Sequence, residues 1–410
     1  MNDGLYGLIG KKLNHSYSPQ IHALLGAYEY NLIELEPEEL DTFFAAREFK
    51  GINVTIPYKI KAMQYCDELS EIAKRIGSVN TIIKRDDGSL YGHNTDYDGF
   101  IYLIRHSNIR VAGKQCFVLG TGGASKAVCP ALKDLGAARV LTVSRTGENN
   151  YETIYNHVDA EIIVNATPVG MYPHCDESLL NIVRFQRLTG LVDLIYNPAH
   201  TDLMLQAEHD YVPVENGLKM LVAQAAASSE LFTGNTYTED KINDVYRKIS
   251  FEMKNILLIG MPGCGKTTVA GLLASKLGRE QIDLDKEIEK QTGRSPAEII
   301  RSDGEPEFRR IETEVLRNVS SLSGKVISCG GGVISPRVNR GLLKRNSNVV
   351  WLQRDIDKLA SEGRPLSELI GTHELYRYRE PLYMESAEYV VNNDGDVNDT
   401  VEKIIEVLKV

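Results

Sequence analysis

A glycine-rich loop in the second half of the chain has the residue types and spacing needed to hold a phosphate chain. The stretch GMPGCGKT at 260–267 completes a GxxxxGK[ST] pattern between the apolar KNILLIG and the amphipathic TTVAGLLASKLG. In such a loop, glycines let backbone N–H groups converge on phosphate oxygens, the lysine reaches the outer phosphates, and the hydroxyl binds Mg²⁺. We expect the phosphate contacts to come from Gly263, Gly265, Lys266, Thr267 and Thr268.

Residues that follow this loop could complete a phosphoryl-transfer site. Asp283 and Asp285 come after a short apolar segment, and on an extended chain both carboxylates would point to one side. One could support hydrated Mg²⁺ while the other accepts a hydrogen bond from a substrate hydroxyl. Arg309 and Glu312 are three residues apart and would share a helix face. The glycines at 330–332 follow the strand-like KVISC and allow close backbone approach to a ligand. Taken singly, each feature is also typical of a solvated face, a surface ion pair or a turn.

A second glycine-rich loop, in the first half, is suited to a dinucleotide. GTGGAS at 120–125 follows the strand-like QCFVLG and opens a helix pattern, which places a helix N-terminus under a pyrophosphate. The next strand pattern ends in Ser-Arg-Thr, where an acid would bind the ribose 2′-hydroxyl of NAD. An arginine there favours a 2′-phosphate and hence NADP(H), with an ordinary surface arginine as the alternative. The expected cofactor contacts are Gly120, Gly122, Gly123, Ala124, Ser144, Arg145 and Thr146.

Several polar groups lie outside these loops. Lys59 follows Pro57 closely, which predicts a lysine in the first turn of a helix, opposing the helix dipole. If Asp96 lies beside it, the pair could handle the proton that accompanies hydride transfer. Asn216, Met220 and Gln224 recur every four residues, which predicts one polar face on an otherwise apolar helix.

The elements that must position these residues alternate between strand and helix patterns, so we expect an α/β fold with parallel sheets. At about 150 residues per domain, 410 residues predict two or three domains. We expect one domain over 1–98, completed by the helix at 216–235, and a Rossmann domain over 99–235. A linker or last helix would span 236–253, before a phosphate-loop domain with a parallel sheet over 254–410.

Composition excludes several classes of protein. A net charge of −10 argues against a surface that coats nucleic acid or an anionic membrane. The six cysteines are scattered without metal-ligand spacing, which indicates reduced thiols, and no apolar run reaches about 18 residues. These features predict a cytoplasmic protein with small-molecule partners, and they leave assembly into a homo-oligomer open.

The clusters of the first half resemble, in order, the shikimate dehydrogenase family over roughly 5–235. The resemblance implies that Lys59 and Asp96 are the catalytic pair. The substrate contacts it implies are Ser16, Ser18, Thr55, Asn80, Gln224 and Tyr196. The cofactor contacts it adds are Thr167, Gly217 and Met220.

The second half resembles the shikimate kinase family over nearly all of 254–410, with the motifs in the same order. The resemblance implies that Lys266 and Thr267 serve ATP and Mg²⁺ and that Asp283 supports the metal. It implies that shikimate is held by Asp285, Arg309, Gly331 and Arg379, and that Arg364, in GRPLS, contacts the ATP phosphates and takes part in catalysis.

The two resemblances converge on one metabolite, since the product of the first reaction is the substrate of the second. They imply NADPH-dependent reduction of 3-dehydroshikimate followed by ATP-dependent phosphorylation of shikimate. Two alternatives stay open at this stage. One is a quinate/shikimate dehydrogenase joined to a broader small-molecule kinase, and the other is a fusion in which one silent half senses the intermediate.

Overall fold

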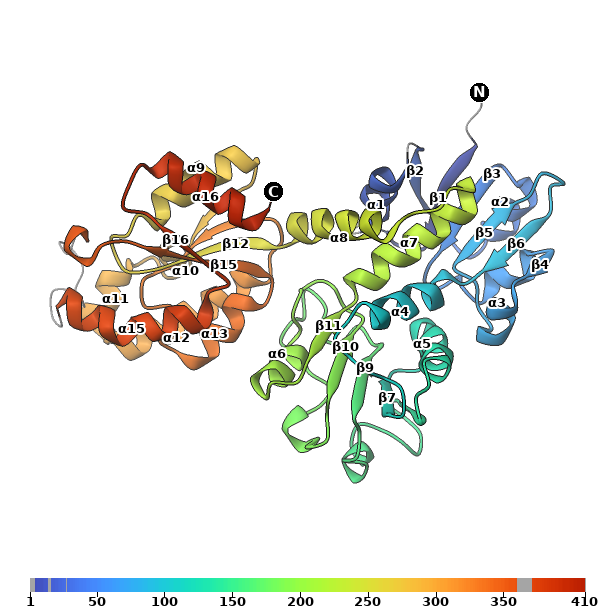
Figure 1. Ribbon diagram of the computed structural model, residues 1–410, viewed down its shortest axis with the longest axis horizontal. Coiled ribbons are helices and arrows are strands. Elements are labelled where there is room, and N and C mark those ends of the chain that lie inside the picture. Colours follow the sequence, from blue (N-terminus) through green and yellow to red (C-terminus); the bar gives the residue numbers. More distant parts are fainter. Residues whose placement is uncertain (1–3, 14–15, 27, 360–370, 410) are drawn as a thin grey trace. The chain divides into compact units, whose positions relative to one another are not determined.

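The computed structural model describes residues 4–13, 16–26, 28–359 and 371–409. The chain divides into two compact units, Met1–Tyr196 with Thr201–Ile249, and Asn197–His200 with Ser250–Val410. Within the described residues the first unit contains two sheets and the second unit one, as Figure 1 shows by element label. This arrangement confirms the expected α/β class.

The first sheet has six strands in the order β2-β1-β3-β5-β6-β4. β1 pairs in parallel with β2 and β3, whereas β5 runs antiparallel to both of its neighbours. Its strands are β1 (Leu5–Gly10), β2 (Tyr30–Glu34), β3 (Phe49–Val54), β4 (Glu68–Leu69), β5 (Thr81–Lys84) and β6 (Leu90–His93). The helices of this part are α1 (Ser18–Leu25), α2 (Leu40–Ala46), the 3₁₀ helix η1 (Lys61–Tyr65) and α3 (Glu71–Ile76).

The second sheet is parallel throughout, with five strands in the order β11-β10-β9-β7-β8. The apolar runs that predicted strands form its buried centre, as a parallel sheet covered on both faces requires. The strands are β7 (Gln115–Leu119), β8 (Arg139–Val143), β9 (Ile162–Asn165), β10 (Gly190–Asp193) and β11 (Val214–Asn216). The helices are α5 (Gly123–Asp134), η2 (Thr153–Asn156), η3 (Ile182–Arg184) and α6 (Asp202–His209).

Two long helices, α4 (Thr95–Arg105) and α7 (Leu218–Thr233), pack side by side, and together they contact both sheets of the first unit (Figure 1). Their backbones approach closely at Gly99, where a Cβ would lie 2.7 Å from the Met220 carbonyl oxygen. At the far end of α7, Phe232 packs against Gly51 of β3 so tightly that a Cβ there would clash with its ring. The late helix therefore packs against the first sheet, and α8 (Glu239–Met253) follows it.

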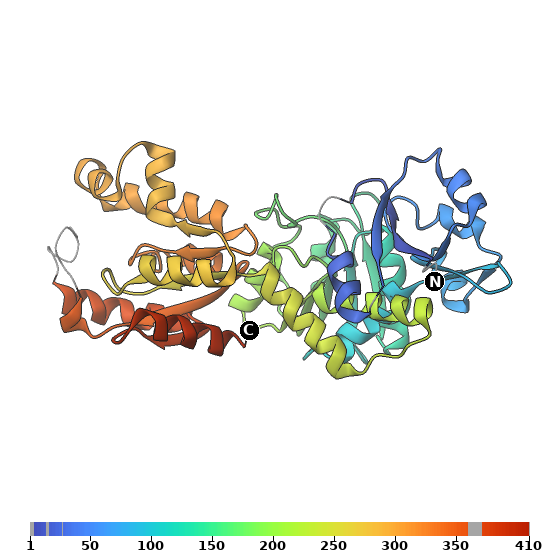
Figure 2. The same ribbon diagram turned by 90° about the horizontal axis from the view of Figure 1, so that it is seen from above.

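The sheet of the second unit is also parallel, in the order β13-β14-β12-β15-β16. Figure 2 shows helices on both sides of this sheet, and its core is built from the central strands. The strands are β12 (Asn255–Ile259), β13 (Gln281–Asp283), β14 (Val326–Ser328), β15 (Ser347–Gln353) and β16 (Tyr389–Asn392). The helices are α9 (Lys266–Leu277), α10 (Leu284–Thr292), α11 (Pro296–Asp303), α12 (Glu305–Ser320), α13 (Arg337–Lys344), η4 (Ile356–Lys358), α15 (Thr372–Ser386) and α16 (Val397–Leu408).

Two local expectations are wrong. Lys59 lies in a turn, because the only helical segment that follows Pro57 within the described part of this loop is η1, which begins at Lys61. Its charge therefore does not oppose a helix dipole. Asn216 ends β11 rather than joining Met220 on α7, because the helix begins at Leu218 after a Gly217 that caps it. No helix of the described residues is long and apolar enough to cross a membrane.

Candidate active sites

The first candidate site is centred on a lysine and an aspartate brought together from different elements. Lys59 Nζ lies 2.5 Å from Asp96 Oδ2, and both side chains are largely buried. The second oxygen of Asp96 accepts a hydrogen bond of 2.9 Å from Asn80 Nδ2. Because both oxygens are engaged, the carboxylate is fixed in orientation and holds the ammonium group at a defined position.

The start of α4 explains why Asp96 sits where it does. Asn94 caps the helix by accepting a hydrogen bond from the Asp96 N–H, as expected of an asparagine at this position. Asn80 also accepts a hydrogen bond of 2.7 Å from the Thr95 N–H. The same asparagine therefore fixes both the backbone and the carboxylate of the first turn of α4.

The dinucleotide loop lies next to this pair. A Cβ built on Gly123, the first residue of α5, would be 3.8 Å from Lys59 Cδ. The N-cap residue Gly122 makes no side-chain cap and has open space around its Cα, so the first N–H groups of α5 can face a pyrophosphate. Gly120 adopts a φ of 104° against Thr167, a conformation that favours glycine. The residues present thus fit a bound dinucleotide, and the loop that would hold its pyrophosphate lies beside Lys59.

Four other residues predicted for this site lie on separate segments of the chain, each with contacts of its own. Ser16 donates a hydrogen bond of 3.1 Å to Ser18 at the start of α1, and Thr55 follows β3, its N–H bonded to the Ile9 carbonyl. Tyr196 packs edge-on against the ring of Tyr17.

On α7, Gln224 comes within 3.5 Å of the Thr95 hydroxyl, next to Asp96. Met220 is nearly buried on the same helix. The helix can begin only with glycine at 217, because a Cβ there would lie 1.9 Å from the Leu194 carbonyl oxygen. The close approach of α7 to α4 thus brings Gln224 to the first turn of α4, which carries Asp96, while Met220 joins the apolar core next to α4.

The segment expected to bind a 2′-phosphate lies at the end of β8. Arg145 and Thr146 are exposed, and the Ser144 hydroxyl donates to the Thr146 carbonyl. The Ser144 N–H is bonded to the Asn149 carbonyl, so the segment folds into a tight turn. The arginine is therefore free to meet solvent on the sheet edge where the ribose is expected, although no contact made by the structure assigns it that role.

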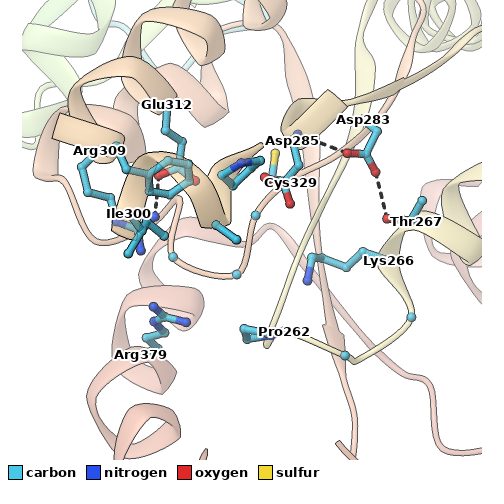
Figure 3. A pocket seen from close by; sticks show the side chains of 18 of the residues that line it. Pro262, Lys266, Thr267, Asp283, Asp285, Ile300, Arg309, Glu312, Cys329 and Arg379 are labelled. Atoms are coloured by element: carbon cyan, nitrogen blue, oxygen red, sulfur yellow. Dashed lines mark hydrogen bonds and ion pairs between the residues drawn. The ribbon is translucent and has the colours of Figure 1, made fainter. Parts of the chain in front are cut away.

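The second candidate site is a cavity of about 580 Å³ in the other unit. Figure 3 shows Lys266, Thr267 and Asp283 on one side of it and Arg309, Glu312 and Arg379 on the other. The other predicted residues that line it are Gly263, Gly265, Thr268, Asp285 and Gly331. The cavity thus contains the predicted phosphate loop at one end and arginine side chains at the other. The sequence analysis predicts a nucleotide at the first end and a small substrate at the second.

Asp283 and Asp285 do not lie on one extended chain, contrary to the expectation from their spacing. β13 ends at Asp283, which caps α10 by accepting hydrogen bonds from the N–H groups of Asp285 and Lys286. The change of direction still leaves both carboxylates on the cavity wall. Burial, with the neighbouring Asp283 charge, raises the pKa of Asp285.

The phosphate end offers oxygen ligands suited to Mg²⁺. Asp283 Oδ2 accepts hydrogen bonds from the hydroxyls of Thr267, at 2.9 Å, and Ser328, at 2.8 Å. The described residues contain no group of three His, Cys, Asp or Glu that could cage a metal alone. One hydroxyl and one carboxylate fit Mg²⁺ that is held chiefly by substrate phosphates and water.

The loop itself is shaped for phosphate. Gly263 and Gly265 have φ values of 83° and 95°, and α9 begins without a side-chain cap. Lys266 Nζ donates to the carbonyl groups of Gly260 and Met261, each at 2.9 Å. The loop lies between β12 and α9 as the sequence predicts, and the phosphate contacts of its residues stay a prediction. Arg364, expected to contact ATP, lies outside the described residues.

The arginine end is built on α12 and α15. Arg309 Nη1 lies 2.6 Å from Glu312 Oε2, and the Glu312 side chain is fully buried. Burial raises the pKa of Glu312 even though the Arg309 charge opposes it. Burial, together with the like charge of Arg309, lowers the pKa of Arg379. An anion bound between these arginines would offset their repulsion, which suits a substrate carboxylate.

The glycine triplet is required by close packing at the same end. A Cβ on Gly331 would lie 2.5 Å from Pro262 Cδ, and the Tyr383 hydroxyl donates to the Gly331 carbonyl at 2.5 Å. Gly332 faces the Arg309 guanidinium at a distance that leaves no room for a side chain. The backbone of the triplet therefore lies against the groups that shape the cavity.

Two supporting residues were not found by sequence reasoning. Asp193, at the end of β10, is buried and accepts hydrogen bonds from Asn165, Thr201 and the Ile195 N–H. Burial raises its pKa to about 6. Asn165 in turn accepts from Thr167, so Asp193 supports the predicted cofactor wall. Ser328 is the other, since it fixes Asp283 from the adjacent strand.

Family models match both units of the chain. Residues 8–82 match the model described as "Shikimate dehydrogenase substrate binding domain", and residues 262–409 match the one described as "Shikimate kinase". The first match runs from within β1 to within β5 and includes Lys59 and Asn80, and the second covers the cavity from Pro262 onward.

Relatives of the first unit are similar over nearly their whole length. The shikimate dehydrogenase (NADP(+)) of Clostridium beijerinckii is 39% identical over 249 residues, 55% of this chain and 91% of the relative. A chorismate mutase/shikimate 5-dehydrogenase fusion protein from Clostridium acetobutylicum is 37% identical, covering 61% of this chain and 98% of its own, with a TM-score of 0.57.

A shikimate 5-dehydrogenase from Thermus thermophilus, solved with NADP(H) and shikimate, is 30% identical. That match covers 59% of this chain and 98% of the solved one, with a TM-score of 0.54. The chain therefore belongs to the shikimate dehydrogenase family and carries a shikimate kinase domain as its second unit.

Proposed function

We propose that this chain is a bifunctional enzyme that reduces 3-dehydroshikimate to shikimate and then phosphorylates shikimate to shikimate 3-phosphate. The observation that supports it most is that each unit has a candidate reaction site of its own. One has the Lys59–Asp96 pair beside a dinucleotide loop, and the other has a phosphate loop and an arginine-rich end in one cavity. When bound, NADPH supplies the hydride and ATP the phosphoryl group.

In the dehydrogenase unit, Lys59 acts as the general acid that protonates the oxygen of the reduced carbonyl. Asp96 holds the ammonium group in place, and Asn80 fixes Asp96. The substrate is held by Ser16, Ser18, Thr55, Asn80, Tyr196 and Gln224. Arg145 selects NADPH by binding its 2′-phosphate, a task that suits a guanidinium group.

In the kinase unit, Arg309 and Arg379 bind the carboxylate of shikimate, and Asp285 accepts a hydrogen bond from a ring hydroxyl. Lys266 leaves its two carbonyl partners to meet the phosphates, while Thr267 and Asp283 hold Mg²⁺ directly or through water. Arg364 adds positive charge at the transferred group. Catalysis is then mainly positioning and charge stabilisation.

Two separate assays test the two sites. With shikimate and NADP⁺, the purified chain should form NADPH, with a clear preference over NAD⁺. With shikimate and MgATP, it should release ADP in step with loss of free shikimate. If the chain oxidises shikimate but does not phosphorylate it in the presence of MgATP, the kinase proposal is wrong. If it phosphorylates shikimate but forms no NADPH from NADP⁺, the dehydrogenase proposal is wrong.

A further inference from the structure

A third arginine, Arg354, lines the kinase cavity besides Arg309 and Arg379. Arg354 follows β15 directly and lines the cavity at the end that contains the phosphate loop. A Cβ built on Gly265 would lie 3.9 Å from Arg354 Nη1. The guanidinium group is therefore next to the loop residue that precedes α9.

The charge of Arg354 has little compensation from the protein. Within the part of the chain that the structure describes, its side chain forms no ion pair, and its Nε atom is buried without a hydrogen-bond partner. Asp394, on the adjoining segment, accepts hydrogen bonds from the Asp355 N–H at 2.8 Å and from Asn392 Nδ2 at 2.6 Å, which lower its pKa more than the charge of Arg354 does. An arginine left in this state beside a phosphate loop is suited to an anion.

The backbone that carries Arg354 is firmly held. The Asn393 N–H donates to the Gln353 carbonyl at 2.8 Å, which ties the ends of β15 and β16 together. Asn393 Nδ2 donates to the Cys264 carbonyl at 2.6 Å, and its Oδ1 accepts from the Thr400 hydroxyl. Arg354 is thus placed by strand ends that also brace the phosphate loop.

We infer that Arg354 is a phosphate-binding residue of the kinase site, a fixed cation that grips the phosphate chain of the nucleotide at Gly265. This inference rests on the proposed kinase function and adds a nucleotide-binding residue to the kinase site. Its position differs from that of Arg309 and Arg379, which extend from α12 and α15 at the opposite end of the cavity. Lys266 and Arg354 would then hold the phosphate chain from two sides of the loop.

Calorimetric titration of the full chain with MgADP and, separately, with inorganic tripolyphosphate tests this role. Saturating NADP⁺ is present throughout, so that the dinucleotide site does not bind the probe. Arg354→Ala should weaken both ligands about ten- to a hundredfold, the range for loss of charge-assisted hydrogen bonds, and Arg354→Lys should recover part of the loss. Arg310→Ala is the matched control, because Arg310 is exposed and its ion pairs among the described residues are with two glutamates of α12, Glu307 and Glu314.

The other possible results of these titrations also test the phosphate-binding role of Arg354. If Arg354→Ala binds MgADP as tightly as the wild type does, the inference is wrong. If MgADP weakens while tripolyphosphate is unchanged, Arg354 contacts the base or ribose, and the phosphate role is refuted. Equal melting temperatures of Arg354→Ala and wild type would show that the variant is folded. Failure of the wild type to bind either probe would instead count against the proposed kinase function itself.

Discussion

The two candidate sites differ in how far the protein balances their charges. In the dehydrogenase unit, Lys59 and Asp96 neutralise each other, and Asn80 takes the second carboxylate oxygen. In the kinase cavity, Arg354 and Arg379 each have a buried Nε atom without a protein partner among the described residues. Lys266 Nζ donates to two backbone carbonyls and to the Cys264 sulfur, which are all uncharged partners.

This difference matches the two chemistries. A proton-transfer pair must be in position before the carbonyl arrives, so its geometry is held by protein contacts alone. A phosphoryl-transfer site must receive several negative charges, so it leaves some of its cations to be balanced by the ligands, although Arg309 is paired with Glu305 and Glu312. We therefore expect the dehydrogenase to be sensitive to loss of internal partners and the kinase to loss of cations.

Lys59→Ala should have the largest effect. It removes the general acid, and we expect dehydrogenase kcat to fall by about 10²–10⁴-fold. Phosphorylation of added shikimate should continue at the wild-type rate, because the kinase cavity lies in a unit of its own. Steady-state assays of both reactions on one preparation provide the measurement. Loss of both activities would contradict two independent sites.

Lys266→Ala is the mirror experiment. We expect the kinase kcat to fall by about 10²–10³-fold, the usual cost of removing one group that stabilises developing charge. The dehydrogenase should keep its kcat and its KM for shikimate. The comparison fails if the variant still phosphorylates shikimate at a rate close to wild type, because the cation would then be dispensable.

The pH dependence of stability tests the buried support of the dehydrogenase. The pKa of Asp193 is about 6 in the fold and close to its ordinary value when unfolded, so the folded state binds the proton more tightly. Its stabilising contribution is complete below about pH 4 and declines as pH rises to about 6, by up to about 3 kcal/mol.

The Asp193→Asn variant isolates this contribution, because it cannot ionise. Urea unfolding of both proteins between pH 4 and 7 should show wild type losing stability relative to the variant as pH rises. A difference that does not change with pH would mean that Asp193 ionises in the fold as freely as it does in water.

Arg145→Ala should have the smallest effect among these changes and should be selective. Loss of charge-assisted hydrogen bonds to the 2′-phosphate should raise the KM for NADPH about ten- to a hundredfold. The KM for NADH, which lacks that phosphate, should change little. Equal changes for both cofactors would assign Arg145 a structural role and leave NADP selectivity to other residues.

The sequence predicts best what a short contiguous pattern determines. The loops at 120–125 and 260–267 lie between strand and helix, as expected. Helix boundaries are harder, because a single capping residue decides them. Because Asp283 caps α10, Asp285 lies in the helix and not on one extended chain with Asp283. Because Gly217 caps α7, Asn216 lies before the helix and does not share a helix face with Met220.

Long-range supports could not be predicted at all. Asp193 meets Asn165 from 28 residues away, and Ser328 meets Asp283 across 45, each through the pairing of parallel strands. Arg354 reaches the phosphate loop because β15 and β16 end together. The order and register of the strands determine these contacts, and a local sequence pattern predicts neither the order nor the register.

The central claim is that one chain performs two consecutive reactions on one metabolite. The most direct measurement is ³¹P NMR, for the phosphorylated product, and ¹H NMR, for free shikimate, of the purified chain incubated with 3-dehydroshikimate, NADPH and MgATP, with each nucleotide omitted in turn. We predict shikimate 3-phosphate only when both nucleotides are present, and free shikimate when ATP is omitted. Absence of the phosphorylated product from the complete mixture would contradict the claim.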